Sequence, residues 1–332
     1  MYDWKELLEK VNQEIKEVGT GRSPQELYEP IRYVLSLGGK RIRPVLMLLA
    51  YNIYKESVEK IYPQALAIET YHNYTLLHDD LMDRADVRRG RPTVHKKWND
   101  NAAILSGDSM LVLAYQYMLK GCPLDKTNDV LNLFTETALE IGEGQQYDIE
   151  FETRNDVREE EYIEMIRLKT SVLLACALKI GAILADAPME QADLLYRFGE
   201  NLGLAFQLQD DYLDVYGDPA VFGKKIGGDI LCNKKTYMFI NAFRLASPED
   251  RAALDMWVAK APGSYVPDEK IAAVTALYDK MAIGQLCQEK ILYYFKEAQQ
   301  VLAQLPLTDE RKKSQADEQA GVVQLSCRLS SR

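Results

Sequence analysis

The chain has 332 residues, of which 47% are hydrophobic and 27% are charged, so it can bury a sizeable core. Its formal net charge of −10 argues against nucleic acid or an anionic membrane surface as the main partner. Five scattered cysteines without CxxC spacing indicate a reduced, cytoplasmic protein, and no apolar run approaches the roughly 18 residues of a membrane span. The charged, amphipathic N-terminus does not resemble a signal peptide.

Helical spacing of apolar residues runs through almost every long segment, and the alternation typical of strands is scarce. We therefore predict an all-α protein. From residue 101 onward the expected helices span residues 101–120, 126–150, 159–186, 191–216, 236–245 and 268–303. No linker or break in composition divides the chain, so one domain over residues 1–305 is the economical interpretation. Residues 306–332 are weakly patterned and are expected to form a poorly ordered tail.

Glycine and proline mark the helix boundaries near the N-terminus. A capping box is expected at residues 23–26, with Ser23 as the N-cap. The following helix is expected to end at the two glycines 38–39, a C-terminal stop signal. Lys40 and Arg43 are then left on the turn before the next helix.

The segment HNYTLLHDDLMDRADVRRGRP, residues 72–92, places three carboxylates just ahead of a basic pair. These residues are Asp79, Asp80, Asp83, Arg88 and Arg89. In a helix Asp79 and Asp83 share one face, and acids so close together need a positive partner. Mg²⁺ is the natural candidate, because it takes oxygen ligands and bridges carboxylates to substrate phosphates, which guanidinium groups also bind. The alternative is a solvated acidic helix end.

A second motif of the same spacing lies in GLAFQLQDDYLDVYGD. It comprises Asp210, Asp211 and Asp214, with Gln207 one turn earlier. Two such motifs, each in an otherwise apolar helix, are hard to attribute to chance, and burying acids without partners is costly. We therefore expect the two helices to face each other across a cavity. Several Mg²⁺ ions held between them would clamp a diphosphate and neutralise it as it leaves.

Together the motifs resemble those of the trans-isoprenyl diphosphate synthases of the polyprenyl synthetase family, over about residues 20–300. The matching stretches are GGKRIRP at 38–44, DDLMD at 79–83, RRG at 88–90, GQQYD at 144–148, Lys169-Thr170, DDYLD at 210–214 and GKKIGGDILCNKKT at 223–236. The resemblance implies the isoprenoid synthase fold, a single large helical bundle around a central active-site cavity. It also implies a homodimer.

The same resemblance implies roles for individual residues. Isopentenyl diphosphate would be bound by Lys40, Arg43, His72 and Arg89. Three Mg²⁺ ions, for which Mn²⁺ can substitute, would be held by Asp79, Asp83 and Asp210, with Asp80, Asp211 and Asp214 completing the two metal motifs. The allylic diphosphate would be bound by those ions together with Arg88, Lys169, Gln207, Lys234 and either Lys224 or Lys225. The reacting centre would be shaped by Thr170, Gln145 and Asp148.

The implied reaction is head-to-tail prenyl transfer, in which isopentenyl diphosphate attacks an allylic cation formed from dimethylallyl, geranyl or farnesyl diphosphate. Tyr74, Thr75 and Tyr71 precede the first aspartate motif and are expected to limit chain length. A single aromatic residue at 74 and no insertion in DDLMD favour C15 to C20 products, leaning to C20. Farnesyl or longer polyprenyl synthases remain alternatives within the family. From other classes, the alternatives are a non-catalytic partner subunit, a terpene cyclase and a purely structural protein.

Overall fold

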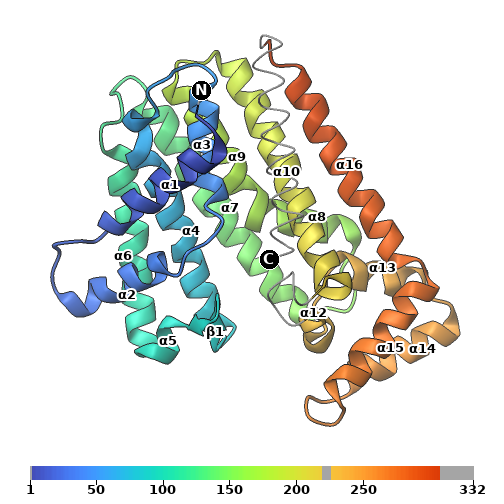
Figure 1. Cartoon of the computed structure of the whole chain (residues 1–332). Coiled ribbons are helices and arrows are strands. Elements are labelled where there is room, and N and C mark those ends of the chain that lie inside the picture. The colour runs from blue at the N-terminus through green and yellow to red at the C-terminus, as the bar shows by residue number, and fades with distance from the viewer. Residues whose placement is uncertain (1, 219–225, 307–332) are drawn as a thin grey trace. The chain divides into compact units, whose positions relative to one another are not determined.

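The computed structural model describes residues 2–218 and 226–306, and its regular structure is almost entirely helical (Figure 1). The predicted all-α fold is confirmed. Within these ranges the strands are confined to β1 (Val87–Arg88) and β2 (Arg91–Pro92), and no helix is long and apolar enough to cross a membrane. Lys224 and Lys225 lie outside the described residues, as does the predicted tail from residue 307 onward.

Contacts between Cα atoms group the chain into two compact units. Unit 1 comprises residues 1–136 and 176–196, and unit 2 comprises residues 137–175 and the described residues from 197 onward. The division falls within three helices: α7 (Thr127–Thr153), α9 (Val172–Leu184) and α10 (Met189–Tyr216). Each unit has a hydrophobic cluster of its own. The assignment of residues 1–305 to one domain stays a prediction.

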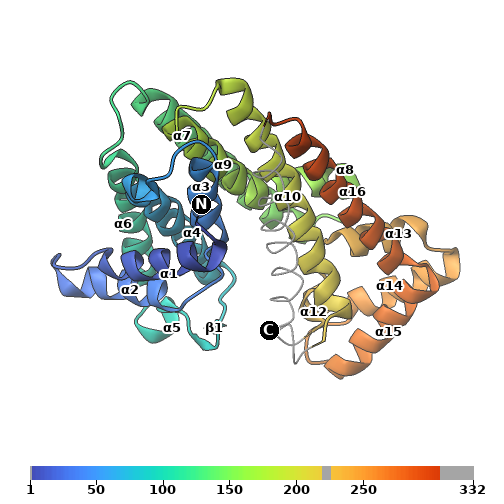
Figure 2. The ribbon, with the colours of Figure 1, turned by 45° about the horizontal axis from the view of Figure 1, so that its top comes forward.

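Unit 1 is built around the pairing of two long helices. Its elements are α1 (Trp4–Glu14), η1 (Ile15–Glu17), α2 (Gln25–Ser36), α3 (Ile42–Asn52), η2 (Val58–Ile61), α4 (Tyr62–Met82), α5 (Val94–Lys97) and α6 (Asp100–Leu119). Helix α4 lies along α6, and its other neighbours include α1, α2 and α3 (Figure 2). Leu66 and Leu77 of α4 pack in one buried cluster with Met110 and Leu113 of α6. This packing fixes the helix that carries the first aspartate motif.

The start of α2 differs from the prediction. The helix begins at Gln25, its N-cap is Pro24, and no side chain caps it, so the predicted capping box with Ser23 as N-cap is wrong. Pro24 has an extended backbone (φ −72°, ψ 149°), which moves the helix start one residue along the chain. The Ser23 hydroxyl is therefore one residue too early to cap the amides of the first turn.

Unit 2 consists of shorter helices around α10. Its further elements are α8 (Glu159–Ile166), η3 (Arg167–Ser171), α12 (Gly228–Cys232), α13 (Tyr237–Leu245), α14 (Pro248–Ala259), α15 (Pro267–Lys280) and α16 (Ile283–Ala303). The predicted interruption at Lys169-Thr170 is confirmed, because η3 is a π-helical turn between α8 and α9. The predicted continuous helix over 268–303 is wrong. Ala282 adopts a left-handed conformation (φ 55°), which separates α15 from α16.

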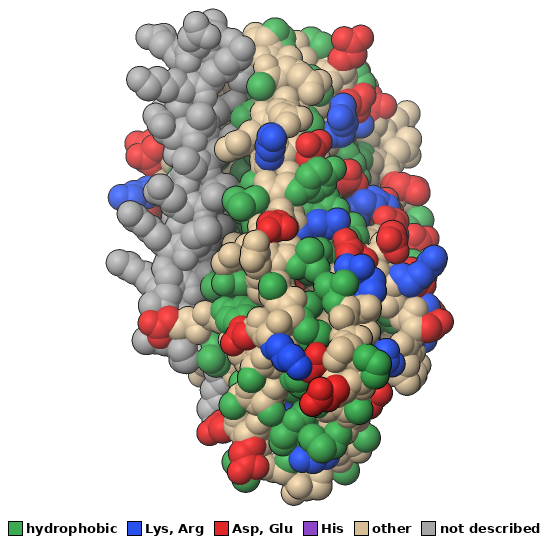
Figure 3. All heavy atoms as spheres, turned by 90° about the vertical axis from the view of Figure 1, so that its right-hand side faces the viewer, with side chains coloured by type: hydrophobic (Ala, Val, Ile, Leu, Met, Phe, Trp, Pro, Cys, Tyr) green, Lys and Arg blue, Asp and Glu red, His purple; other side chains and the backbone are tan. Residues whose placement is uncertain are grey.

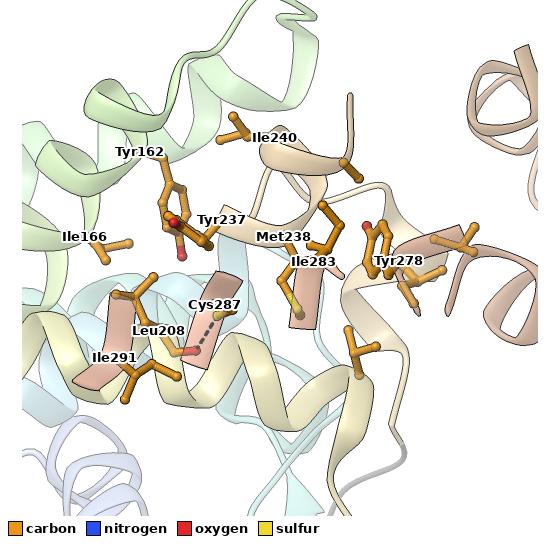
Figure 4. Packing of buried hydrophobic residues seen from close by; sticks show 14 of the residues in the cluster. Tyr162, Ile166, Leu208, Tyr237, Met238, Ile240, Tyr278, Ile283, Cys287 and Ile291 are labelled. Atoms are coloured by element: carbon orange, nitrogen blue, oxygen red, sulfur yellow. Dashed lines mark hydrogen bonds between the residues drawn. The ribbon is translucent and has the colours of Figure 1, made fainter. Parts of the chain in front are cut away.

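Buried side chains of unit 2 support the inner face of α10. Tyr162, Leu208, Cys287 and Ile291 belong to one hydrophobic cluster (Figure 4). The thiol of Cys287 donates to the carbonyl oxygen of Leu208 at 3.7 Å. Figure 3 shows the side on which α14, α15 and α16 lie. Apolar side chains there are mixed with charges of both signs. The helix that carries the second aspartate motif therefore packs against buried side chains of α8 and α16.

Candidate active site

A tight hairpin carries the two arginines of the RRG motif in unit 1. Strands β1 and β2 pair in antiparallel register, with Arg88 opposite Arg91. Arg89 and Gly90 form the two-residue turn between them, and both have positive φ (52° and 73°), as a type I′ turn requires. The guanidinium of Arg89 donates to the carbonyl oxygen of Gly38. The hairpin therefore brings the RRG motif against the GGKRIRP turn.

The GGKRIRP segment also contacts α4. Arg43 lies in the first turn of α3 and not, as predicted, on the turn before that helix. Arg43 Nη1 lies 3.3 Å from His72 Nε2. Burial, followed by the charges of Arg43 and Arg89, holds the pKa of His72 well below its usual value. The imidazole is therefore neutral near pH 7. Three of the four residues predicted to bind isopentenyl diphosphate thus surround one turn, and the fourth, Lys40, is exposed on it.

The first aspartate motif ends α4 and separates into two kinds of acid. Asp83 is exposed and Asp79 is partly exposed, whereas Asp80 is buried. Arg88 Nε donates to Asp80 Oδ2 at 2.7 Å, and Arg88 Nη2 lies 3.8 Å from Asp79 Oδ2. Burial raises the pKa of Asp80, and the hydrogen bond from Arg88 opposes that rise. One arginine thus neutralises the middle acid and reaches towards an outer one.

The second aspartate motif, in unit 2, shows the same division with different partners. Asp210 is exposed, and Asp214 accepts a hydrogen bond from the backbone N–H of Asp229 at 3.0 Å. Asp211 is only 4% exposed, and it accepts from the Tyr162 hydroxyl and from Gln207 Nε2, the latter at 3.3 Å. Burial, followed by the charge of Asp229, raises the pKa of Asp211 to about 7. Here the middle acid is held by neutral donors.

The remaining polar residues of unit 2 meet at the π-helical turn η3. Lys169 Nζ donates to Asp148 Oδ2 at 2.6 Å, and Thr170 Oγ1 donates to Gln207 Oε1 at 3.2 Å. Burial disfavours ionisation of Asp148, but the charges of Lys234 and Lys169 outweigh it and hold the pKa of Asp148 below its usual value. The GQQYD, Lys-Thr and Lys-Lys-Thr motifs are therefore neighbours in the fold. Gln145 is partly exposed.

Two glycines for which no individual role was expected permit this arrangement. A Cβ atom on Gly144 would lie 2.4 Å from the Lys169 backbone nitrogen, and one on Gly203 would lie 2.5 Å from Ser171 Cα. Only glycine lets α7 and α10 approach the π-helical turn so closely. Gly144 had a signal, because it opens the GQQYD motif. Tyr162, the partner of Asp211, had none, since nothing in the sequence distinguishes this aromatic residue of α8 from a core residue.

The residues expected to limit chain length lie on α4 within unit 1. Tyr71 is buried, and its ring packs edge-on against Phe134 with centroids 5.3 Å apart. Tyr74 is half-buried beside Tyr71, at 5.4 Å between ring centroids. The Thr75 hydroxyl donates to the backbone carbonyl of His72. The structure groups the aromatic rings, and their role in product length stays a prediction.

The donor chemistry suits a hard divalent cation. The exposed or partly exposed acids of the two motifs offer carboxylate oxygens only, which Mg²⁺ and Mn²⁺ prefer. Among the described residues, no group of three or more His, Cys, Asp or Glu side chains lies close enough to hold a metal ion by itself. Substrate phosphate oxygens and water would therefore have to complete the coordination, as is usual for Mg²⁺.

The all-α fold, with two aspartate-rich helix ends beside clustered cations, defines a class of protein that handles phosphorylated substrates. A model of the polyprenyl synthetase family matches residues 24–278, and the chain belongs to that family. It is a prenyltransferase, and members of the family generally use a divalent metal.

Named relatives and solved structures agree with this assignment. The chain is 39% identical over 283 residues to the geranylgeranyl diphosphate synthase of Methanosarcina mazei, covering 81% of this chain and 87% of the relative. It is also 39% identical over 251 residues to the geranylfarnesyl diphosphate synthase of Natronomonas pharaonis, covering 70% and 74%. A crystal structure of a geranylgeranyl pyrophosphate synthase aligns over 99% of both chains with a TM-score of 0.93 and 42% identity.

Proposed function

We propose that this protein is a Mg²⁺-dependent prenyltransferase that condenses isopentenyl diphosphate with allylic diphosphates. The product is a short-chain trans-prenyl diphosphate of C15 to C20, leaning to geranylgeranyl diphosphate. One observation carries the proposal. In each unit an aspartate motif exposes outer carboxylates while its middle acid is held inward, and in each unit cations lie among the same motifs. That arrangement supplies ligands for metal ions and donors for diphosphate together.

The residues that would hold three Mg²⁺ or Mn²⁺ ions are Asp79 and Asp83 of the first motif and Asp210 of the second. When bound, such ions would supply positive charge to neutralise a departing diphosphate. Arg88, Lys169, Gln207, Lys234 and either Lys224 or Lys225 contact the allylic diphosphate. Asp80, Asp211 and Asp214 complete the two motifs.

Isopentenyl diphosphate is bound on unit 1 by Lys40, Arg43, His72 and Arg89. Because Arg43 donates to its Nε2, His72 carries its proton on Nδ1, and this N–H is the group it offers to an acceptor such as a phosphate oxygen. A histidine base is not needed, since the departing diphosphate can take the proton lost after attack.

The polar atoms at η3 shape the reacting centre. Thr170 donates to Gln207 Oε1, which leaves the lone pairs of the Thr170 hydroxyl directed elsewhere. Fixed oxygen dipoles of this kind, with that of Gln145, stabilise an allylic cation electrostatically. Asp148 keeps Lys169 in place through their ion pair. Apolar surroundings exclude water that would quench the cation.

Product length is set on α4. Tyr74 forms the floor of the cavity that holds the growing prenyl chain, with Tyr71 and Thr75 beside it. Relatives of equal identity are named as geranylgeranyl and geranylfarnesyl synthases, so the comparison alone does not choose between C20 and C25. The aromatic residue at 74 favours the shorter chain.

We also propose a cytoplasmic homodimer whose synthase domain spans residues 1–305. An exposed apolar row on α6 supports the dimer. Leu105, Val112 and Leu119 are 57%, 68% and 46% exposed and recur at heptad spacing. Such a row is typical of a helix that packs against another chain.

The test of the function is a product assay. Purified protein is incubated with Mg²⁺, isopentenyl diphosphate and dimethylallyl diphosphate, and the products are separated by chromatography after dephosphorylation. Linear C20 alcohols are expected, with C15 as the main minor product. Cyclic hydrocarbons would indicate a terpene cyclase, and no turnover in the presence of Mg²⁺ would contradict the proposal.

A further inference from the structure

We propose that Arg41 and Glu69 form a positioning element that presets the site for isopentenyl diphosphate. Neither residue is among those expected to touch substrate. The inference rests on the proposed function, because that function assigns the GGKRIRP turn to the binding of isopentenyl diphosphate.

Arg41 is a hub that ties the GGKRIRP turn to three helices. Its side chain is 2% exposed. It donates to Glu69 Oε1 of α4 at 2.6 Å and to the carbonyl oxygen of Leu35, near the end of α2, at 2.6 Å. A third donation reaches Asn12 Oδ1 of α1 at 3.3 Å. The planar guanidinium can make these three contacts at once, which a lysine ammonium in the same place could not match in geometry.

Glu69 is itself held in place on α4. Its side chain is 3% exposed, and Oε1 also accepts from Asn73 Nδ2 at 3.0 Å. Glu69 stands one turn before His72 on the same helix. The ion pair therefore connects the turn directly to the helix segment that carries a predicted substrate residue.

The residues expected to bind isopentenyl diphosphate lie around this hub. Lys40 precedes Arg41, and Arg43 follows it by two residues and contacts His72 at 3.3 Å. Arg89 donates to the carbonyl of Gly38 in the same turn. Any shift of the turn relative to α4 would therefore move Lys40 and Arg43 relative to His72 and disturb the contact with Arg89.

The backbone of Arg41 supports a functional role for the hub. Its φ of 49° is unfavourable for a residue with a Cβ atom, and such conformations persist where the surroundings over-determine them. Stability alone is a weak explanation, because the desolvation of a buried ion pair offsets most of its attraction. Placing the turn is the role that the three contacts have in common.

The double variant Arg41→Met/Glu69→Met tests the inference. It removes both charges without leaving either one buried alone, so the chain is expected to fold. We expect KM for isopentenyl diphosphate to rise about 10-fold, while KM for the allylic substrate and kcat change less than about 2-fold. Arg41→Lys should show the same selective rise in KM for isopentenyl diphosphate, because it keeps the charge but loses the planar guanidinium.

A control in the same unit separates positioning from general destabilisation. Lys126 donates to Asp186, another non-glycine residue with positive φ, far along the chain from the turn. Lys126→Met should lower the melting temperature and leave both KM values unchanged. The inference is overturned if a folded Arg41 variant keeps the parent KM for isopentenyl diphosphate, or if both KM values rise equally.

Failure to fold would not rescue the inference. Glu69→Gln keeps the shape and an acceptor oxygen, and it should raise the same KM by about 3-fold through the weakened contact. An unchanged KM in that variant would also overturn the inference. If instead the unaltered protein fails to condense the two substrates, the proposed function fails.

Discussion

The two aspartate motifs have the same spacing but are held in place in different ways. In both, the middle acid is buried and the first acid is at least partly exposed. Asp80 is neutralised by the charge of Arg88, whereas Asp211 is held by the neutral donors Tyr162 and Gln207. The difference shows that a shared sequence motif fixes which acid turns inward, and that the surrounding fold chooses its partner.

The two sites also differ in the kind of contact that holds them, which is mainly side-chain charge in unit 1 and close backbone packing in unit 2. In unit 1, side chains of the RRG hairpin and of the GGKRIRP segment hold the site, namely Arg88, Arg89 and Arg43. In unit 2 close backbone contacts hold much of the site, because α7 and α10 approach η3 at Gly144 and Gly203. We therefore expect the unit 1 site to depend more on the charges of its supporting arginines, and the unit 2 site to be more sensitive to added volume.

Removing an outer acid should have the largest effect, and an equal one in both motifs. Asp79→Ala and Asp210→Ala each delete a proposed metal ligand, so kcat/KM is expected to fall about 10³-fold in either variant. Steady-state rates across a Mg²⁺ titration measure this. Asp255→Ala, on the exposed side of α14, should leave the rate unchanged. A large loss in one motif alone would mean that the two do not share the work.

Adding one methyl group should distinguish the close-packed site. Gly144→Ala places a Cβ 2.4 Å from the Lys169 backbone nitrogen, so the π-helical turn must move. Displacement of Lys169 and Thr170 is expected to lower kcat about 10²-fold. Gly142→Ala lies two residues earlier on α7, where an added Cβ meets nothing within 4 Å. That control should keep full activity and gain about 0.5–1 kcal/mol of stability; equal losses in both would contradict the packing argument.

Removing the neutral partner of the buried acid should cost stability more than rate. Tyr162→Phe deletes the hydroxyl that donates to Asp211 and leaves its ring in the core. The free energy of unfolding is expected to fall by about 1–3 kcal/mol, because a buried acceptor loses a donor. Urea denaturation measures it. Tyr147→Phe, at a 43% exposed position of α7, is the matched control and should change little.

Much of this site could be predicted because each motif is local. Residue type and spacing within a few positions predict the end of α2 just before Gly38-Gly39. They also predict the interruption at Lys169-Thr170. The inward turn of Asp80 and Asp211 also follows from helix geometry, about 100° from the preceding acid.

The rest depends on contacts between segments far apart in sequence. Tyr162 and Asp211 are 49 residues apart, and Arg41 and Glu69 are 28 apart. Neither pairing has a spacing that sequence periodicity can reveal. The break at Ala282 has a different cause: apolar spacing continues across it while the backbone turns left-handed.

The smallest expected effect is the pH dependence that His72 contributes at the cation-rich site. The folded pKa of His72 is below its ordinary value, because burial and the charges of Arg43 and Arg89 disfavour the imidazolium. The unfolded chain then takes up the proton first as pH falls. The stability contributed by the neutral imidazole is complete above the unfolded pKa of about 6.5, and it is lost as pH falls towards the folded value.

This contribution can be measured as a difference between two proteins. Free energies of unfolding in EDTA are compared between pH 7 and pH 5 for the parent and for His72→Gln, which cannot titrate. The parent should lose more stability over this range, by at most about 1.4 kcal/mol per pH unit. Parallel curves would mean that His72 titrates alike in both states. The site would then lack the crowding of cations that distinguishes it from the site around Asp211.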